Sequence, residues 1–238
     1  MIQGLYTAAS GMVAHQIRLD MLANNLANVD TAGFKADLVA LDVSVAPQDS
    51  MSNSSIPMSS VLADRPGVDP RPGPLKTTGN PLDLAIVGPG LFVVETPQGE
   101  RYTRAGNFVQ DANGFLTTQN GFRVLGSGGP VAVPETGLQM DETGRLATGE
   151  TLRFVVGPER ARLIKVGDNL FASEGETARP EDLPAARVVQ GQVEGSNVNV
   201  VMTMVDMLAT MRTYEAYQRT IQALDQTVGQ AANDLGRV

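Results

Sequence analysis

Apolar residues at the N-terminal end of the chain repeat with the period of an α-helix. Two rows of a heptad pattern are occupied by Leu5, Met12, Leu19 and Leu26 and, three residues later, by Ala8, His15 and Leu22. The segment contains no proline and mostly good helix formers, so it predicts one helix over residues 2–28. The helix should end near Asn28, because the next residues, Asp30-Thr31-Ala32-Gly33, are typical of a turn.

A second apolar repeat predicts a helix from about residue 196 to the end of the chain. Ser196 or Asn197 is the predicted N-cap. The apolar row steps by three or four residues through Val201, Met204, Leu208, Met211, Tyr214, Tyr217, Ile221, Leu224 and Val228. Between Leu208 and Tyr217 three consecutive steps are of three residues, which predicts a stammer where the helix bends or overwinds.

The region between the helices has the texture of β-structure. Short apolar runs, separated by glycine and proline at strand-length intervals, predict strands at residues 82–87, 91–95, 101–103, 122–125, 131–133, 153–156 and 162–166. Two segments share one pattern, in which an aspartate is followed three residues later by a glycine: Asp111-Ala-Asn-Gly-Phe-Leu-Thr-Thr118 and Asp141-Glu-Thr-Gly-Arg-Leu-Ala-Thr148. Both predict tight turns of β-hairpins.

These elements predict an α+β fold with a β-rich middle domain and long N- and C-terminal helices that pair as a coiled coil. A long isolated helix cannot bury its own apolar stripe, and each terminal helix is the only long heptad partner for the other. We expect a helical assembly domain over 1–34 plus 196–238 and a β-rich middle domain over 82–195. Residues 35–81, rich in Ser, Pro, Asn and Gly, are expected to form an irregular connector.

The first half of the C-terminal helix is apolar around most of its circumference, so one partner helix cannot cover it. Four of its residues are methionines, whose flexible side chains suit contacts with differing neighbours. We therefore expect intermolecular contacts along the terminal helices. The predicted assembly interface comprises Leu5, Met12, Leu19, Leu22, Asn24, Asn25, Leu26, Phe34, Val201, Met204, Leu208, Met211, Tyr214, Tyr217, Ile221, Leu224 and Val228.

Composition excludes several kinds of chemistry. The 238 residues include no Cys and no Trp and only one His, so thiolate metal sites, Cys nucleophiles and sites needing two imidazoles are excluded within one chain. His15 lies in the predicted helix seam and is interpreted as a packing residue. No catalytic residue, cofactor or metal ligand is predicted.

Other candidate motifs have simpler interpretations. Gly88-Pro89-Gly90 lacks the continuation of a phosphate-binding loop and predicts a tight turn between strands. Asp111 and Asp141 lack the remaining ligands of a calcium loop. Asn53 lies in a weak glycosylation sequon. For Asn24, Asn25 and Asn28, two roles stay open: ending the helix, or fixing register within an apolar seam.

Charge and hydropathy bear on the partners. The net charge of −8 offers no evident basic surface, so nucleic acid is not an expected partner. No apolar stretch has the roughly 20 residues that a membrane span needs. The first residues lack the basic and apolar regions of a cleavable signal peptide, which favours the cytoplasm or an export route that reads no such peptide.

Three ordered motifs carry a resemblance to a known family. They are Leu22-Ala-Asn-Asn-Leu-Ala-Asn-Val-Asp-Thr-Ala-Gly-Phe-Lys35; Thr78-Gly-Asn-Pro-Leu-Asp-Leu-Ala-Ile-Val-Gly-Pro-Gly-Leu-Phe-Val93 with Tyr102-Thr-Arg-Ala-Gly-Asn-Phe108; and Glu194-Gly-Ser-Asn-Val-Asn-Val200 with Met211-Arg-Thr-Tyr-Glu-Ala-Tyr-Gln218. Together they resemble the flagellar rod and hook proteins over nearly the whole chain. Pro89 and Val200 depart from the family's usual residues.

The resemblance implies a structural subunit of the bacterial flagellar basal body, exported through the flagellar type III apparatus without a cleaved signal and assembled in the periplasmic space into the torque-carrying rod. Its implied partners are copies of itself and other rod proteins. The lack of large insertions and the segment 162–171 resemble proximal-rod members, with distal-rod members as the alternative. A hypothesis from another class is a β-rich hydrolase or carbohydrate-binding module with helical dimerisation ends.

Overall fold

A computed structural model of the protein describes residues 2–38, 41–44, 60–63, 67–135, 137–147, 149–155, 162–174 and 187–235. The chain forms two compact units. Unit 1 comprises Met1–Ala27, Asp37–Pro66 and Asn199–Val238, and unit 2 comprises Asn28–Ala36 and Gly67–Val198. The chain therefore passes between the units four times. Two terminal helices and a β-rich middle confirm the predicted α+β class.

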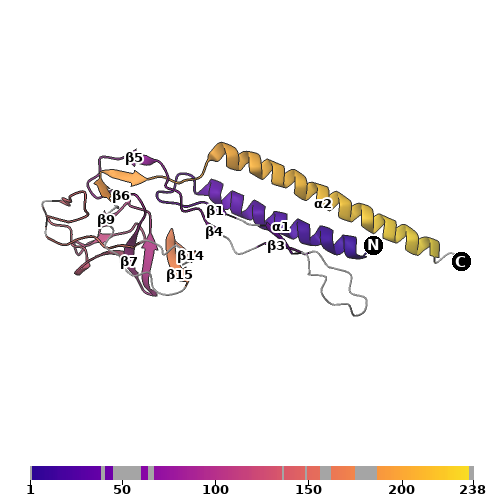
Figure 1. The fold of residues 1–238 in the computed structure, drawn as a ribbon, viewed down its shortest axis with the longest axis horizontal. Helices are drawn as coiled ribbons and strands as arrows, with labels where there is room; N and C mark the ends of the chain where they lie inside the picture. The colour runs from indigo at the N-terminus through magenta and orange to yellow at the C-terminus, as the bar shows by residue number, and fades with distance from the viewer. Residues whose placement is uncertain are drawn as a thin grey trace. The chain divides into compact units, whose positions relative to one another are not determined.

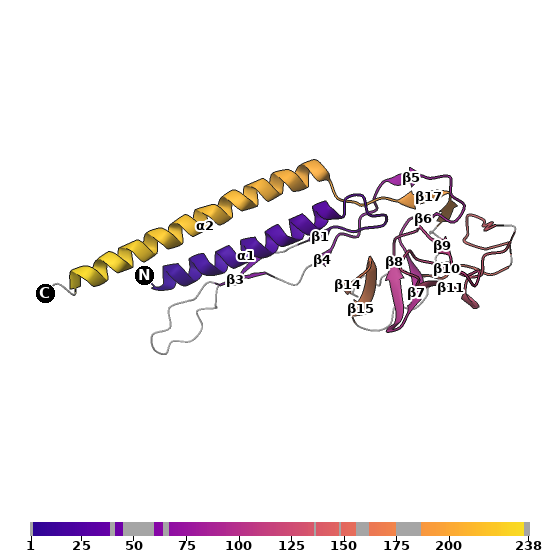
Figure 2. The same cartoon turned by 180° about the vertical axis from the view of Figure 1, so that it is seen from behind.

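Unit 1 is built on the two long helices. α1 (Ile2–Ala27) and α2 (Val200–Leu235) lie side by side and run in opposite directions (Figures 1 and 2). The N-terminal helix is thus confirmed to within one residue of its predicted end. β1 (Asp37–Leu38) follows α1, and β2 (Leu41–Ser44) pairs antiparallel with β3 (Ser60–Ala63), which lies against α1.

The start of α2 differs from the prediction. Asn199 is the N-cap, because its side-chain Oδ1 accepts a hydrogen bond from the Met202 N–H at 3.1 Å. Asn197, a predicted N-cap, instead accepts a hydrogen bond from the Ala36 N–H at 2.7 Å, and the other candidate, Ser196, is buried. The N-cap prediction was wrong because Asn197 lies before the helix begins, and its side chain bonds to Ala36, a residue far away in the sequence.

Unit 2 contains the β-structure, and every strand pairing described within it is antiparallel. Its largest sheet has nine strands in the order β14-β15-β8-β7-β11-β10-β9, with β12 beside β11 and β13 beside β7. These strands are β7 (Leu91–Thr96), β8 (Gly99–Thr103), β9 (Val109–Gln110), β10 (Leu116–Thr117), β11 (Arg123–Gly126), β12 (Gly129–Pro130), β13 (Phe154–Val155), β14 (Arg162–Gly167) and β15 (Leu170–Glu174).

Part of the predicted connector belongs to unit 2. β4 (Gly67–Val68) lies near β14, and β5 (Leu75–Thr77) pairs with β17 (Gln192–Glu194). A further pair joins β6 (Leu84–Val87) to β16 (Arg187–Gln190). The sequon at Asn53 lies outside the described residues. The partner of β5, residues 192–194, comes from a distant part of the chain. Local sequence patterns cannot reveal such a pairing.

β7 has apolar packing on both faces. Phe92 and Val94 belong to one buried cluster, whereas Leu91 and Val93 belong to another. Alternate residues of a strand point to opposite sides, so these clusters lie on the two faces of the sheet. This explains why the sequence of β7 is a continuous apolar run, which the strand prediction over 91–95 used.

Both predicted aspartate turns form. Asp111 Oδ1 accepts hydrogen bonds from the N–H groups of Asn113 and Phe115, both at 2.8 Å, and the turn joins β9 to β10. Asp141 Oδ1 makes the equivalent bonds to Thr143 and Arg145, at 2.9 and 3.0 Å. The strand predicted over 131–133 was misplaced: β12 is earlier, and Ala132 makes only an isolated bridge with Phe115.

Candidate assembly surface and charged junction

One row of α2 residues is buried or half-buried while most of the helix is exposed. Its members are Thr203, Met207, Thr210, Tyr214, Tyr217, Ile221 and Leu224. Their steps alternate strictly between four and three residues, so the row contains no stammer. The predicted stammer arose because the row was drawn through Leu208 and Met211, which lie outside it and are exposed.

Tyr217 marks where α2 meets α1. A Cβ atom on Gly11 would lie 2.9 Å from Tyr217 Cζ, so a glycine is needed for the ring to approach α1. The ring of His15 lies 5.5 Å from that of Tyr217, centroid to centroid. Burial, and then the charge of Arg18, lower the pKa of His15, which favours the neutral imidazole. His15 is therefore a packing residue, as predicted.

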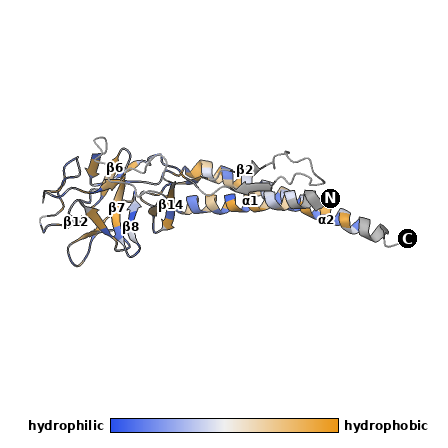
Figure 3. Ribbon diagram, turned by 60° about the horizontal axis from the view of Figure 1, so that its bottom comes forward, coloured by the Kyte–Doolittle hydropathy of each residue, from blue (hydrophilic) through white to orange (hydrophobic). Residues whose placement is uncertain are grey.

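The first half of α2 presents a large apolar surface to solvent. The exposed fractions are 69% for Val201, 59% for Met202, 47% for Met204, 54% for Val205, 58% for Leu208 and 49% for Met211. We call these six residues the α2 apolar face; the hydrophobic positions along α2 are coloured in Figure 3. Fully burying one such side chain stabilises an assembly by about 1.5–3 kcal/mol, so this face strongly favours a neighbour.

α1 offers a smaller exposed apolar area. Val13 is 56% and Ile17 38% exposed, and the two residues are one helical turn apart. The predicted interface residues Met12, Leu19, Leu22 and Leu26 are half-buried instead. The side chain of Leu5 lies outside the part that the structure describes. Val228, near the end of α2, is 47% exposed.

Two predicted interface residues are covered by this chain itself. Asn25 is buried, and it donates to the Asp37 carbonyl at 3.0 Å while its Oδ1 accepts from the Asp37 N–H at 2.8 Å. Asn24 is exposed and donates to Asp37 Oδ2 at 2.9 Å. Both amides thus fasten the segment after α1 back onto the helix.

Phe34 is the second covered residue, with 5% of its surface exposed. The ammonium nitrogen of Lys165 lies 3.8 Å from the centre of its ring, a cation–π contact within unit 2. Within the single chain, Asn25 and Phe34 are therefore buried, unlike the exposed residues of the α2 apolar face.

Unit 2 contains a buried cluster of three charged residues, which we call the charged junction: Lys35, Arg104 and Glu194. Glu194 Oε1 accepts from Lys35 Nζ at 2.6 Å, and Glu194 Oε2 accepts from Arg104 Nε at 2.5 Å. The side chains of these residues are 7%, 4% and 1% exposed, in the order Lys35, Arg104, Glu194. Buried charges persist only when they are paired in this way.

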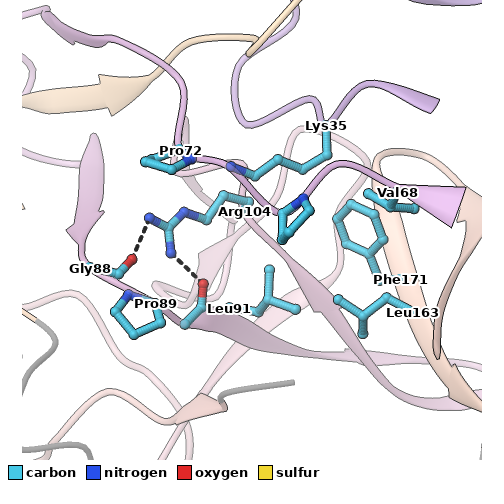
Figure 4. A pocket seen from close by; sticks show the side chains of 11 residues that line it. Lys35, Val68, Pro72, Gly88, Pro89, Leu91, Arg104, Leu163 and Phe171 are labelled. Carbon is cyan, nitrogen blue, oxygen red and sulfur yellow. Dashed lines mark hydrogen bonds between the residues drawn. The ribbon is translucent and has the colours of Figure 1, made fainter. Parts of the chain in front are cut away.

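Arg104 fastens the junction to the turn between β6 and β7. Its guanidinium donates to the carbonyls of Ile86 and Gly88 at 2.7 and 2.8 Å, and also to that of Gly90 (Figure 4). The predicted turn at 88–90 is therefore confirmed, and it has an additional use. Its carbonyls point to one cation, which is how a buried guanidinium obtains enough acceptors.

Backbone contacts hold the same segments together. Gly33 N–H donates to the Glu194 carbonyl at 2.7 Å, and Gly73 N–H donates to Glu194 Oε1 at 2.9 Å. A Cβ on Gly73 would lie 2.1 Å from the Gly195 carbonyl oxygen, so the two backbones touch. Asn197 adds a bond from its side-chain amide to the Arg71 carbonyl at 3.0 Å.

Three cationic or N–H donors control the ionisation of Glu194. Burial alone would raise the pKa of Glu194, but the Lys35 ammonium, the Gly73 N–H and the Arg104 guanidinium outweigh it and hold the pKa below its ordinary value of 4.5. Burial lowers the pKa of Lys35 below its ordinary 10.5, opposed by the charge of Glu194.

The lowered pKa of Glu194 predicts acid sensitivity of unit 2. Above pH 4.5 the carboxylate is ionised whether or not the chain is folded, and its full contribution is present. As the pH falls, the unfolded state takes up the proton first, so stability is lost until the pH has passed through the folded-state pKa. We expect thermal unfolding followed from pH 7 to about pH 3 to show a smaller acid-induced loss in Glu194→Gln than in the natural protein.

A matched control for the acid experiment is Glu100→Gln, because Glu100 pairs with Arg153 at the surface. This variant should keep the full acid dependence of the natural protein. An identical acid dependence in Glu194→Gln and the natural protein would contradict the assignment of this sensitivity to the junction.

A cavity of about 460 Å³ lies beside the charged junction, within unit 2 (Figure 4). Lys35 and Arg104 contribute polar wall atoms, while most of the lining is apolar. Its apolar lining residues are Val68, Pro70, Pro72, Pro89, Leu91, Leu163 and Phe171. No group of three potential metal-binding side chains occurs among the described residues. In the same part of the chain, neither helix is long and apolar enough to cross a bilayer.

All three junction residues lie inside the motifs that carry the family resemblance, although the sequence alone predicted no role for them. Each stands next to an apolar or hydroxyl-bearing neighbour and within two residues of a glycine: Gly33-Phe-Lys35, Arg104-Ala-Gly106 and Glu194-Gly195. A charged residue between strand-like and glycine-containing sequence is a weak signal of a buried ion pair. The identity of its partner, distant in sequence, is not encoded locally.

Comparison with known proteins defines the class to which these features belong. Three family models match: the flagella basal body rod protein over residues 5–35, the flagellar hook protein FlgE/F/G D1 domain over 85–149, and the flagellar basal body rod FlgEFG protein C-terminal over 189–235. Lys35, Arg104 and Glu194 each fall in a different one of these matches. The chain is therefore made of the parts shared by rod and hook proteins.

The chain belongs to the flagellar basal-body rod protein family. It is 34% identical to the flagellar basal-body rod protein FlgF of Escherichia coli and 35% identical to FlgF of Salmonella typhimurium, in each case over 97% of both chains. It is also 28% identical to the rod protein FlgG of Bacillus subtilis, over 98% of this chain and 99% of that one. The family resemblance read from the three motifs is thus confirmed.

Proposed function

We propose that this chain is a structural subunit of the bacterial flagellar basal-body rod, which polymerises through its terminal helices into a helical, tubular shaft that transmits torque. The observation that carries the proposal is the α2 apolar face, six large apolar residues exposed within one stretch of helix. Membership of the rod protein family supports it. A surface of this kind on a structural protein is best explained by a neighbouring subunit.

The geometry of assembly follows from the position of these residues. The buried row of α2 meets α1 of the same chain, and we propose that the two helices pair there as a coiled coil. The α2 apolar face lies outside that row, so a neighbour binds α2 on a different side. A contact between unlike surfaces of identical subunits produces an open helical assembly when its rotation does not close.

The family relationship supports further parts of the proposal. Partners are copies of the chain and other rod proteins, and delivery is through the flagellar type III export apparatus, without a cleaved signal peptide, into the periplasmic space. Within the family, the role of a proximal rod protein of the FlgF type is proposed, since full-length FlgF relatives match at 32–35% identity. FlgG relatives match at 28–32%, so the distal rod role is the alternative.

Mixing the purified chain with the other purified rod proteins of its own bacterium tests the proposal. We expect the full chain to form large assemblies with at least one of them, because each contact buries exposed apolar helix surface. Analytical ultracentrifugation measures their size, and cross-linking with mass spectrometry identifies which protein lies at which end. A chain that stays monomeric with every rod protein would contradict the proposed function.

A further inference from the structure

The charged junction joins segments that are remote in sequence, and the segments of Lys35, Gly73 and Glu194 each lie close to a point where the chain passes from one unit to the other. Lys35 and Glu194 are 159 residues apart, and Arg104 and Glu194 are 90 apart. Lys35 lies two residues before the chain enters unit 1 at Asp37, and Glu194 lies five residues before it does so at Asn199. Gly73, bonded to the same carboxylate, follows the entry into unit 2 at Gly67.

We propose that Glu194 is the positioning residue of a clamp that fastens the segments 28–36, 67–74 and 194–198 of unit 2 to one another and to the β-sheet, so that force passing along the chain between the two units is shared among these segments. The proposal rests on the proposed function, since only a subunit under torque has such a force to share. It assigns a role to the charged junction beyond local stability.

The bonds of Glu194 reach every segment named. One carboxylate oxygen accepts from Lys35 and from the Gly73 N–H, the other accepts from Arg104, and the main-chain carbonyl accepts from Gly33. Four partners therefore depend on one residue. If each segment were tethered separately, a pull on one would not be resisted by the others.

Two further residues carry the clamp into the rest of unit 2. Arg104 directly follows β8 of the nine-stranded sheet, and it connects the carboxylate to the carbonyls of Ile86 and Gly88, at the end of β6. Lys35 donates to the Arg71 carbonyl at 2.8 Å, and Asn197 donates to the same carbonyl. The segments are thus held to the sheet as well as to each other.

Charge makes Glu194 the member on which the others depend. Removing the carboxylate deprives both buried cations of the counter-charge to which they are hydrogen-bonded, and the charge of Arg104 already disfavours a proton on Lys35. Asp69 also acts on Lys35, but its carboxylate is hydrogen-bonded to Arg71. If either cation is removed, the other stays paired with Glu194. If Glu194 is removed, both cations lose this partner. A neutral amide of the same shape therefore tests the clamp.

The experiment compares Glu194→Gln with Leu116→Ala in the full chain. Leu116 is fully buried in the main core of unit 2, away from the junction residues in sequence and in the hydrogen-bond pattern. Both variants should lower the Tm of unit 2 by about 10 °C. Amide hydrogen exchange under native conditions is then measured at Gly33, Gly73 and Gly195, and swimming is measured in media of rising viscosity.

If the clamp acts as proposed, the Gly73 amide exchanges about tenfold faster in Glu194→Gln than in Leu116→Ala at equal global stability, because its acceptor is weakened locally. Cells with Glu194→Gln lose swimming in viscous medium, while cells with Leu116→Ala keep it. Adding Lys35→Met to Glu194→Gln should lower the Tm little further, since the two residues act as one unit.

Equal Gly73 exchange in the two variants would overturn the clamp, and so would equal swimming at every viscosity. Failure of the proposed function has a different signature: the natural chain would not assemble with rod proteins at all, whatever the exchange at Gly73. The exchange measurement uses the purified chain alone and therefore separates the two failures.

Discussion

Leu208→Asp should abolish incorporation of the chain into the rod while leaving the isolated chain folded. Leu208 lies in the α2 apolar face and is 58% exposed, so an aspartate there remains in contact with water in the free subunit. The lower helix propensity of aspartate costs only about 0.5 kcal/mol. In the proposed assembly the same position is buried against a neighbour, where an unpaired carboxylate costs several kcal/mol. The difference between the two states predicts loss of assembly without loss of folding.

Circular dichroism of the purified variant measures its helix content, calorimetry measures the unfolding of unit 2, and swimming together with basal-body composition measures incorporation. Helix content and unit 2 unfolding should equal those of the natural chain, and swimming should be absent. Ile221→Asp is the informative comparison, because Ile221 belongs to the half-buried row that meets α1. That variant should lose helix content as well as incorporation.

Gln222→Asp provides the control for added charge, since Gln222 is an exposed polar residue of the same helix. It should incorporate normally. Rods of natural composition in cells with Leu208→Asp would show that the α2 apolar face is not an assembly surface. Loss of the unit 2 transition in either Leu208→Asp or Ile221→Asp would show that the two units do not unfold independently.

Gly106→Ala should be the most damaging small change in unit 2. A Cβ atom at this position would lie 1.6 Å from the Leu84 carbonyl oxygen, and Leu84 N–H donates to the Gly106 carbonyl at 2.9 Å. The two backbones are therefore in direct contact, and the new methyl group has no flexible side chain to displace. Leu84 is fully buried in the main core, so its backbone cannot shift without disturbing that packing. We expect a loss of about 3 kcal/mol or more in the free energy of unfolding.

Denaturant unfolding of unit 2, monitored by near-ultraviolet circular dichroism, measures this loss. Gly128→Ala is the matched control within the same unit: its Cβ would lie 3.2 Å from the Glu150 Oε1, the end of a flexible side chain. That substitution should change stability by no more than about 0.5 kcal/mol. Equal stability of the two variants would mean that the contact between Gly106 and Leu84 is not required for folding.

Local patterns were sufficient for the elements whose signal lies within one segment. The helix α1, the strand β7 and the aspartate turns at Asp111 and Asp141 were all predicted and all form. In each case the residues that decide the structure are neighbours in the sequence. The apolar surface of the first half of α2 was also predicted from residues that are neighbours in the sequence, and these residues are exposed.

The side of α2 that meets α1 could not be predicted, because two rows compete for it. The row through Leu208 and Met211 is more hydrophobic, yet the buried row contains Thr203 and Thr210 instead. A buried threonine is tolerated in a helix when its hydroxyl has a partner nearby, and Thr210 Oγ1 donates to the Asp206 carbonyl at 2.7 Å. The more hydrophobic positions, Leu208 and Met211, remain exposed.

The charged junction could not be predicted for a different reason. Hydropathy assigns lysine, arginine and glutamate to the surface, and only a partner brought from another part of the chain makes their burial possible. Asn197 and Asn25 illustrate the same limit, since both were interpreted through the helix ends beside them. Their actual partners, Ala36 and Asp37, became visible only with the fold.

The sequence separations within the charged junction also set the order in which unit 2 can fold. Lys35 and Arg104 each need the carboxylate of Glu194, which lies 159 and 90 residues further along the chain. Contacts between such distant residues form late, because the entropy of closing a long loop is lost before the contact stabilises anything. A chain synthesised from its N-terminus therefore lacks the carboxylate that bonds to both cations until residue 194 is present. The charged junction, and with it the fold of unit 2, can be completed only when nearly the whole chain is present.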